Sequence, residues 1–349
     1  MQTKHKLSVF GSLITTCGFT WWLLAEEHML IPSQKTSAAI DLVQSGSTTQ
    51  AEIEATDITP TDEQKASDQI TTAMSVSLQQ VAYMHSQRLL YPAYSQPIID
   101  DDSPYLSWNE FIEIPLPILD GNSSASLSVK KFRHFYPDEI AVELKTDEPM
   151  IGATLEVLSV DNQQLLATVS SDSKQWFIAP DSDWPEEIRL VAKVDFERGE
   201  DVVSADIRFY HPVASIVSVG NGYASGPDML LPITLDVGQA GIYRVRANLY
   251  QSEGHAIASL VQRKSLSEGE QIIELKAFKS VLPNGSNDLE LRNLVIERMS
   301  GFPGEKAGYG QSASERYPVG TFDTGSLSDE DYQMSEQERQ QVAFLEQIL

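Results

Sequence analysis

Two groups of aspartates are the residues of this sequence that could most readily bind a metal ion. Asp100, Asp101 and Asp102 are consecutive, while Asp181 and Asp183 lie in a second turn-like segment. Calcium is held by loop carboxylates and carbonyls of this kind, but neither group has the glycine and terminal glutamate of an EF-hand. The five aspartates are therefore weak candidate ligands of a structural calcium ion, and no other cofactor is expected.

The sequence contains no recognisable motif for zinc binding or nucleophilic catalysis. No two histidines have the spacing of a zinc motif, and the sequence contains no GxSxG nucleophile elbow. We therefore name no catalytic, zinc-binding or cofactor-binding residue and expect a protein that is not an enzyme. Because 50 acidic residues produce almost every carboxylate spacing, an exported hydrolase with an unrecognised carboxylate pair stays open as an alternative.

Aromatic rings in turns are the remaining candidates for ligand contact. Trp184 lies between Asp183 and Pro185, where we expect it to be exposed, and Tyr223 lies within the glycine-containing loop 220–226. Exposed rings can stack on sugars, whereas a tryptophan within a strand, such as Trp176, is expected in a core. Trp184 and Tyr223 are weak ligand-binding candidates, and a carbohydrate-binding module protein is a second alternative.

Charge limits the class of partner, and cysteine content limits how the fold can be stabilised. The 50 acidic and 25 basic residues give a formal net charge of −25, which argues against nucleic acid as a partner. The single cysteine is Cys17, so the chain beyond residue 25 has no disulfide and depends on hydrophobic cores.

The first 25 residues predict export. Basic residues at positions 4–6 precede residues 7–24, which carry no charge, as in a secretory signal or an inner-membrane anchor. Cleavage after Ala25 and lipidation at Cys17 are alternatives that the sequence leaves open. We expect the chain beyond this segment in the periplasm or at the cell surface, with the membrane contacted through residues 7–24.

Composition divides the chain that follows. Residues 26–61 are rich in Ser, Thr, Asp and Glu and predict a flexible acidic tether. Residues 62–125 predict an amphipathic helix over 62–90, with its apolar stripe packed on a domain or a partner, and then a strap rich in proline and aromatic residues. We expect the strap to lie across a domain face.

From residue 126 short alternating runs replace the helical period, as in β-strands. They predict two immunoglobulin-like β-sandwiches, at 126–211 and 212–300, the first containing a hairpin that turns at Asp161 and Asn162. Residues 301–349 predict a Gly-rich loop and a C-terminal helix, capped by Ser335 and Glu338.

Three stretches carry a resemblance to known proteins, namely Tyr94–Pro97, Phe132–Pro137 and Gly241–Tyr250. Over about residues 90–300 the chain resembles uncharacterised exported bacterial proteins with tandem immunoglobulin-like modules. The resemblance implies a location in the envelope and carries no functional residues.

The sequence therefore predicts a mainly β protein, with tandem immunoglobulin-like sandwiches preceded by a signal or anchor helix and an amphipathic helix. We expect a non-catalytic exported protein that binds or scaffolds an envelope protein or a glycan. A sandwich fold alone does not identify the ligand.

Overall fold

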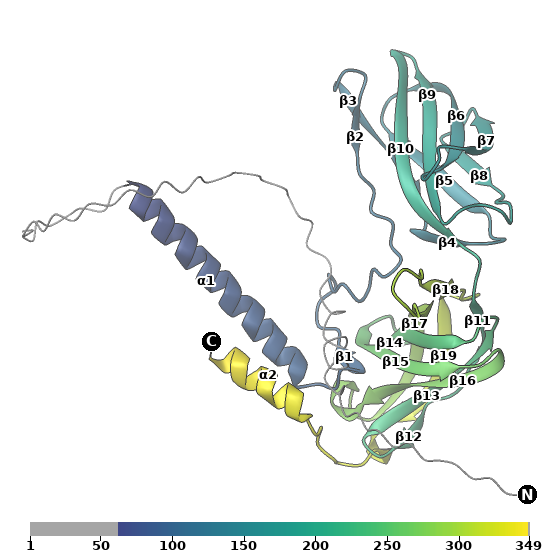
Figure 1. Ribbon diagram of the computed structural model, residues 1–349. Helices are drawn as coiled ribbons and strands as arrows, with labels where there is room; N and C mark the ends of the chain where they lie inside the picture. The colour runs from purple at the N-terminus through teal and green to yellow at the C-terminus, as the bar shows by residue number, and fades with distance from the viewer. Residues whose placement is uncertain (1–61, 348–349) are drawn as a thin grey trace, which may run out of the picture. The chain divides into compact units, whose positions relative to one another are not determined.

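The computed structural model describes residues 62–347, and for residues 62–73 it describes only the course of helix α1. The predicted signal or anchor (1–25) and the acidic tether (26–61) lie outside the described residues. The described chain is mainly β, with two helices, α1 (Asp62–Leu89) and α2 (Glu336–Glu346) (Figure 1). Neither helix of this part of the chain combines the length and the hydropathy that a membrane-spanning helix needs.

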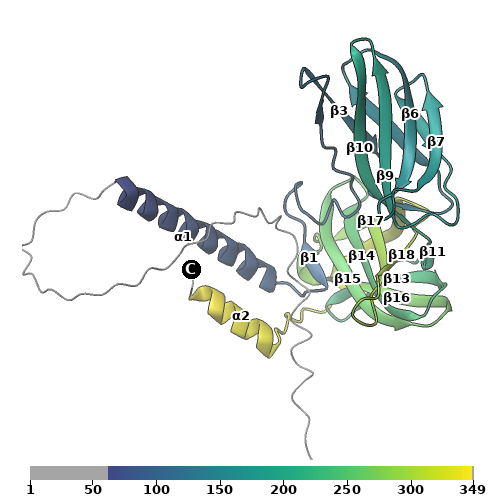
Figure 2. The same ribbon diagram turned by 45° about the horizontal axis from the view of Figure 1, so that its top comes forward.

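The first β-sandwich contains a four-stranded and a five-stranded sheet. The four-stranded sheet has the order β2-β3-β5-β8, formed by β2 (Leu116–Ile118), β3 (Ser123–Val129), β5 (Ile140–Thr146) and β8 (Gln175–Ile178). The five-stranded sheet has the order β4-β10-β9-β6-β7, formed by β4 (Arg133–Phe135), β6 (Met150–Ser159), β7 (Leu165–Ser171), β9 (Glu187–Phe196) and β10 (Gly199–Tyr210). Figure 2 shows β10, β9, β6 and β7 side by side, and the pairing is antiparallel except between β4 and β10.

The second sandwich also has two sheets. One is formed by β1 (Ser95–Pro97), β14 (Gly241–Gln251), β15 (Ala256–Leu266), β17 (Ser286–Arg298), β18 (Gly308–Gly310) and β19 (Arg316–Asp323). The other is formed by β11 (Ala214–Val219), β12 (Tyr223–Ser225), β13 (Asp228–Val237) and β16 (Gly269–Phe278). Short 3-10 turns at Lys279–Val281 and Thr324–Ser326 complete the elements.

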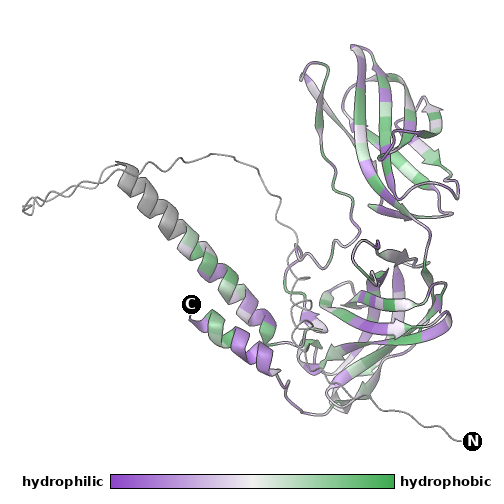
Figure 3. Cartoon of the chain, viewed as in Figure 1, coloured by the Kyte–Doolittle hydropathy of each residue, from purple (hydrophilic) through white to green (hydrophobic). Residues whose placement is uncertain are grey.

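Strict alternation of side chains explains why these segments are strands. Along β9, Ile188, Leu190 and Val194 face inward and are at most 1% exposed, while the residues between them face outward. Figure 3 shows this alternation as stripes of opposite hydropathy on the strands. Each buried branched side chain stabilises the fold by about 1.5–3 kcal/mol, so the two separate cores can hold the sandwiches without disulfides.

Several local predictions are confirmed. The hairpin β6–β7 turns at the predicted Asp161 and Asn162, and Trp176 is 1% exposed in the first core. Helix α2 begins with the predicted capping box, in which Ser335 and Glu338 each accept a backbone N–H of the other.

The predicted boundaries of the sandwiches are wrong at three places. The strap supplies β1 to the second sandwich and β2 to the first, and both strands lie at a sheet edge, where Pro97 and Pro117 are tolerated. The predicted Gly-rich loop contains β18 and β19. A Cβ atom at Gly310 would lie 2.6 Å from the carbonyl oxygen of Ala214, so this glycine permits close packing of two backbones.

Around Tyr105 and Trp108 the strap packs on the second sandwich, whereas Asn109 and Glu113 contact the first. The Arg246 guanidinium is 4.2 Å from the centroid of the Trp108 ring. The side-chain amide of Asn248 donates a hydrogen bond of 2.6 Å to the carbonyl of Tyr105. Burial, with the neighbouring charge of Arg244 as a smaller cause, lowers the pKa of Arg246 to about 10.

Helix α1 forms where it was predicted, but its apolar stripe is not covered within the described residues. Met74, Leu78, Val81 and Met84 are all more than half exposed, whereas Ala82 is buried. Helix α2 packs along α1 (Figures 1 and 2). The four apolar side chains nevertheless stay exposed.

Candidate functional site

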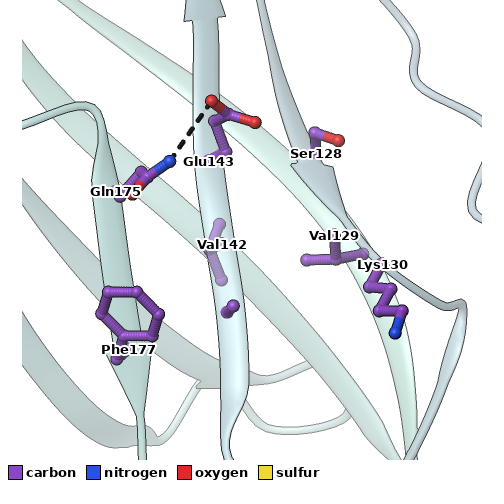
Figure 4. Close-up of a pocket in the computed structure, with 8 residues that line it drawn as sticks. Ser128, Val129, Lys130, Val142, Glu143, Gln175 and Phe177 are labelled. Atoms are coloured by element: carbon purple, nitrogen blue, oxygen red, sulfur yellow. Dashed lines mark hydrogen bonds between the residues drawn. The ribbon is translucent and has the colours of Figure 1, made fainter.

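The candidate site is a shallow hollow on the outer face of the β2-β3-β5-β8 sheet (Figure 4). Its volume is about 300 Å³, at the lower end of the range for small-ligand sites. It is lined by residues of β3, β5 and β8 together with the residue that follows β3: Ser128, Val129, Lys130, Ala141, Val142, Glu143, Gln175 and Phe177.

The pairing register of β5 and β8 determines which of these side chains face outward. Val142 and Trp176 are paired and face the core, so their neighbours along β5 and β8 face outward. Phe177 is paired with Ala141, whose small side chain leaves the space beside the ring unfilled. Phe177 is 58% exposed and forms one wall of the hollow.

A polar row borders the ring. Ser128, Glu143 and Gln175 lie on neighbouring strands at matching positions of the ladder. The side-chain amide of Gln175 donates to Glu143 over 3.5 Å, a long hydrogen bond that a ligand could replace (Figure 4).

A second carboxylate supports this row from the side. Glu113 accepts hydrogen bonds of 2.5 Å from Ser128 and from Lys145. The hydrogen bond from Lys145, with a smaller contribution from Ser128, lowers the pKa of the Glu113 carboxyl. Glu113 is thus held as an ion that orients the Ser128 hydroxyl.

The arrangement is suited to binding. Phe177 offers apolar surface, Glu143 accepts hydrogen bonds, Gln175 both donates and accepts, and Lys130 supplies a positive charge. All but Lys130 are on strands, which hold their side chains more rigidly than loops do. The lining residues include no histidine or cysteine.

A larger hollow of about 400 Å³ at the end of the same sandwich is a weaker candidate. It lies between the β2–β3 and β9–β10 turns, and Asp201 accepts the Leu119 backbone N–H at 2.7 Å. Leu119 and Asp120 have φ values of 52° and 59°. The Asp201 carboxylate therefore stabilises a strained turn, which accounts for its presence without a ligand.

The structure does not bring the sequence candidates together. Trp184, expected to be exposed, is only 6% exposed and packs against Phe209, with ring centroids 5.7 Å apart. Its turn folds back so that the Trp184 backbone N–H donates to the Asp181 carbonyl, and the large ring fills the core. The expectation of an exposed Trp184 is therefore wrong.

Tyr223 lies on β12 of the second sandwich and is 45% exposed. Its hydroxyl donates to Glu274 at 2.5 Å, and this hydrogen bond raises the pKa of the phenol. Its hydroxyl is thus engaged within the protein, and its role in binding stays a prediction.

The five aspartates considered for calcium are all exposed. Among residues 74–347, whose side chains the structure describes, there is no group of three or more His, Cys, Asp or Glu that could hold a metal ion.

Sequence reasoning missed Phe177 and Glu143. The available signal was the neighbouring pair of Trp176 and Phe177 in a predicted strand, because adjacent residues of a strand face opposite sides. One of these rings had to face outward, but the sequence alone did not show which one.

Comparison with known proteins yields structural neighbours only. No family profile and no curated protein sequence matches the chain. A DUF4785 family protein from Legionella pneumophila is 18% identical with a TM-score of 0.39, and the match covers 50% of this chain and 53% of that one.

A BSP domain of a biofilm-associated protein is 8% identical with a TM-score of 0.20, covering 56% of this chain and 29% of the other. Native E. coli alpha-2-macroglobulin is 11% identical with a TM-score of 0.23, covering 57% and 16%. The chain thus matches about half of the first neighbour's length and less of the other two, and at these TM-scores the likenesses carry no functional conclusion.

Proposed function

We propose that this protein is a non-catalytic, exported envelope protein that binds an envelope protein or a glycan through the surfaces of its β-sandwiches. The observation that carries the proposal is the hollow around Phe177, where an exposed ring lies beside a polar row on rigid strands. Aromatic anchors surrounded by hydrogen-bonding groups are the usual centres of binding surfaces.

The energetic argument concerns the exposed part of the Phe177 ring. Full burial of a phenylalanine side chain contributes about 1.5–3 kcal/mol, and 58% of this residue is still exposed. A ligand that covers the ring would gain about 1–2 kcal/mol from it, roughly tenfold in affinity. Hydrogen bonds to Glu143 and Gln175 would then orient that ligand.

Export is part of the proposal and is supported by the sequence pattern of residues 1–25. Fractionation of cells that express the full chain, with N-terminal sequencing of the product, tests it. Membrane-bound protein with an intact N-terminus supports an anchor, and a soluble periplasmic product beginning at Glu26 supports a cleaved signal. Cytoplasmic protein with an intact N-terminus would contradict export.

Binding at the hollow is tested by photo-cross-linking in cells. A photoreactive phenylalanine analogue replaces Phe177 in one variant and Val202, which is 52% exposed on β10 of the other sheet, in the control. The proposal expects a discrete adduct from position 177 and none from position 202. Equal labelling at both positions, or no adduct at position 177, would remove the hollow as the binding site.

A glycan is the more specific second candidate, because an apolar ring beside a carboxylate and an amide matches a sugar's C–H face and its hydroxyls. Affinity electrophoresis in gels that contain soluble polysaccharides tests it. Retardation of the wild type that is lost in Phe177→Ala supports a glycan, whereas equal mobility in every gel leaves a protein as the partner.

A further inference from the structure

Strand β7 forms an unusually bare edge of the first sandwich. It is the last strand of the β4-β10-β9-β6-β7 sheet and runs over Leu165–Ser171 without a charged residue or a proline. Outside its ladder with β6, none of these seven residues takes part in a backbone hydrogen bond with any described residue. Every second residue of an antiparallel edge strand directs its N–H and C=O groups outward, where they can pair with another strand.

Other edges of the two sandwiches carry features that discourage pairing. β1, β2 and β19 contain proline, and the outer side of β11 is bonded to Tyr309 and Gln311 by way of Val213 and Ile216. Some long strands have no paired neighbour on one side along part of their length, and these strands carry charges: Glu200 and Asp201 on β10, Arg263 and Lys264 on β15, and Glu270 and Glu274 on β16. Charge and proline are the usual protections of an edge. The edge strands β8, β12 and β18 also lack both, but they have only four, three and three residues, so β7 is the long unprotected edge among the described strands.

Some groups on the other edges are also satisfied within the chain. On β16 the Ile272 carbonyl accepts from Lys264 at 2.7 Å, and the Phe278 N–H donates to the buried Ser95 hydroxyl at 3.0 Å. Among the residues that the structure describes, none makes a comparable contact with the backbone of β7.

We propose that β7 pairs with β7 of a second copy of this chain, antiparallel and centred on Thr168. The two copies would then join their five-stranded sheets into one continuous sheet. In this register Thr168 lies opposite Thr168, and Ala167 lies opposite Val169 on the side of the core. Threonine pairs and small branched pairs across strands are favourable.

Charge selects a second copy as the occupant. A chain with a net charge of −25 repels itself at most surfaces, yet residues 163–171 carry no charge. At the ends of the paired strands Asp172 lies opposite Gln164, and Lys174 lies opposite Asn162. No like charges are therefore opposed at this edge, so self-pairing there adds no local charge repulsion.

Half-buried apolar side chains support the same occupant. Leu166, Ala167 and Val169 are only partly buried against the first core. A second β7 would extend this core across the junction and remove more of their apolar surface from water.

Disulfide trapping in the full chain tests the proposal. Cys17 is replaced by serine, and Thr168→Cys is introduced as the only cysteine. Residues directly opposite in an antiparallel pair have Cα atoms about 4.5–5.5 Å apart, within the range of a disulfide. The proposal expects most of the chain at twice its 38.7 kDa mass on a non-reducing gel after mild oxidation.

Thr154→Cys in the same background is the matched control. Thr154 lies on β6, one strand further in, and pairs with Ser170, so the two copies of this residue would be about 20 Å apart and could not be bridged. A monomeric Thr168→Cys variant, or equal cross-linking of both variants, would overturn the proposal.

A charged variant gives a second readout. Thr168→Lys places two lysines opposite each other between copies, while Glu156 on β6 pairs with position 168 within one copy. Sedimentation should show that the Cys17→Ser protein is a dimer. Adding Thr168→Lys should raise the dissociation constant of this dimer about fivefold and leave the melting temperature unchanged. A dimer that is unchanged by Thr168→Lys would place the contact elsewhere and refute pairing through β7.

Discussion

His134 makes the stability of the first sandwich depend on pH. The residue lies on β4, and its Nε2 atom is buried without a hydrogen-bond partner among the described residues. Burial lowers the pKa of His134 to about 4, and the positive charge of Lys131 acts in the same direction. A hydrogen bond with the Lys131 backbone and the charge of Asp138 oppose this shift only in part.

The sign follows from the two states of the protein. In the unfolded chain the histidine binds a proton near pH 6.5, whereas in the folded protein it stays neutral down to about pH 4. The unfolding free energy is therefore fully present above pH 6.5 and decreases as the pH falls toward 4. Each pH unit in this window costs about 1.4 kcal/mol, so the loss at pH 5 is about 2 kcal/mol.

Urea unfolding at pH 8.0, 6.5, 5.5 and 5.0 measures this loss, with fluorescence of the buried Trp176 and Trp184 reporting on the first sandwich. His134→Gln lacks the titrating group and should lose about 2 kcal/mol less than the wild type between pH 8 and pH 5. His255→Gln, in an exposed turn, is the matched control and should follow the wild-type curve. Parallel curves for His134→Gln and the wild type would refute the reasoning.

Four further outcomes are expected. Trp176→Ala should destabilise the first sandwich by about 3–5 kcal/mol in urea unfolding. Phe177→Ala should change its stability by less than about 1 kcal/mol but weaken ligand binding roughly tenfold. Similar stability losses for the two variants would contradict the assigned faces. Gly310→Ala should lower the unfolding free energy of the second sandwich by about 1–3 kcal/mol, because its Cβ would meet the Ala214 carbonyl; an unchanged urea midpoint would refute that close approach. Burial raises the pKa of Tyr210 to about 12, so stability should fall as the pH rises from 10 to 12 and fall less in Tyr210→Phe, as followed by circular dichroism. Excess chelator should leave the melting temperature unchanged, and a decrease would support the calcium hypothesis.

The prediction of the fold succeeded where spacing along the chain controls the structure. A strand that alternates needs only its own residues to define two faces, so β9 and the hairpin β6–β7 were readable from the sequence. The same holds for the cap of α2, because Ser335 and Glu338 satisfy backbone groups within one turn of helix.

The candidate site was predicted less well, because exposure depends on what other segments cover. Trp184 follows an exposed turn in the sequence, yet the fold directs its ring onto Phe209. Trp176 and Phe177 are adjacent rings of similar character, and only packing against the opposite sheet decides which of them is buried.

The sequence by itself determined that this protein is mainly β, with two sets of strands and cores that do not rely on disulfides, because side-chain alternation and cysteine content are local properties. Tertiary structure decided that Pro97 and Pro117 lie in edge strands and that Gly310 lies in a strand packed against a neighbouring backbone. It also decided that β7 ends a sheet, with no described residue paired to its outer side. These features depend on which segments, distant in sequence, pair or pack together. The spacing of residues along one segment does not specify its partners.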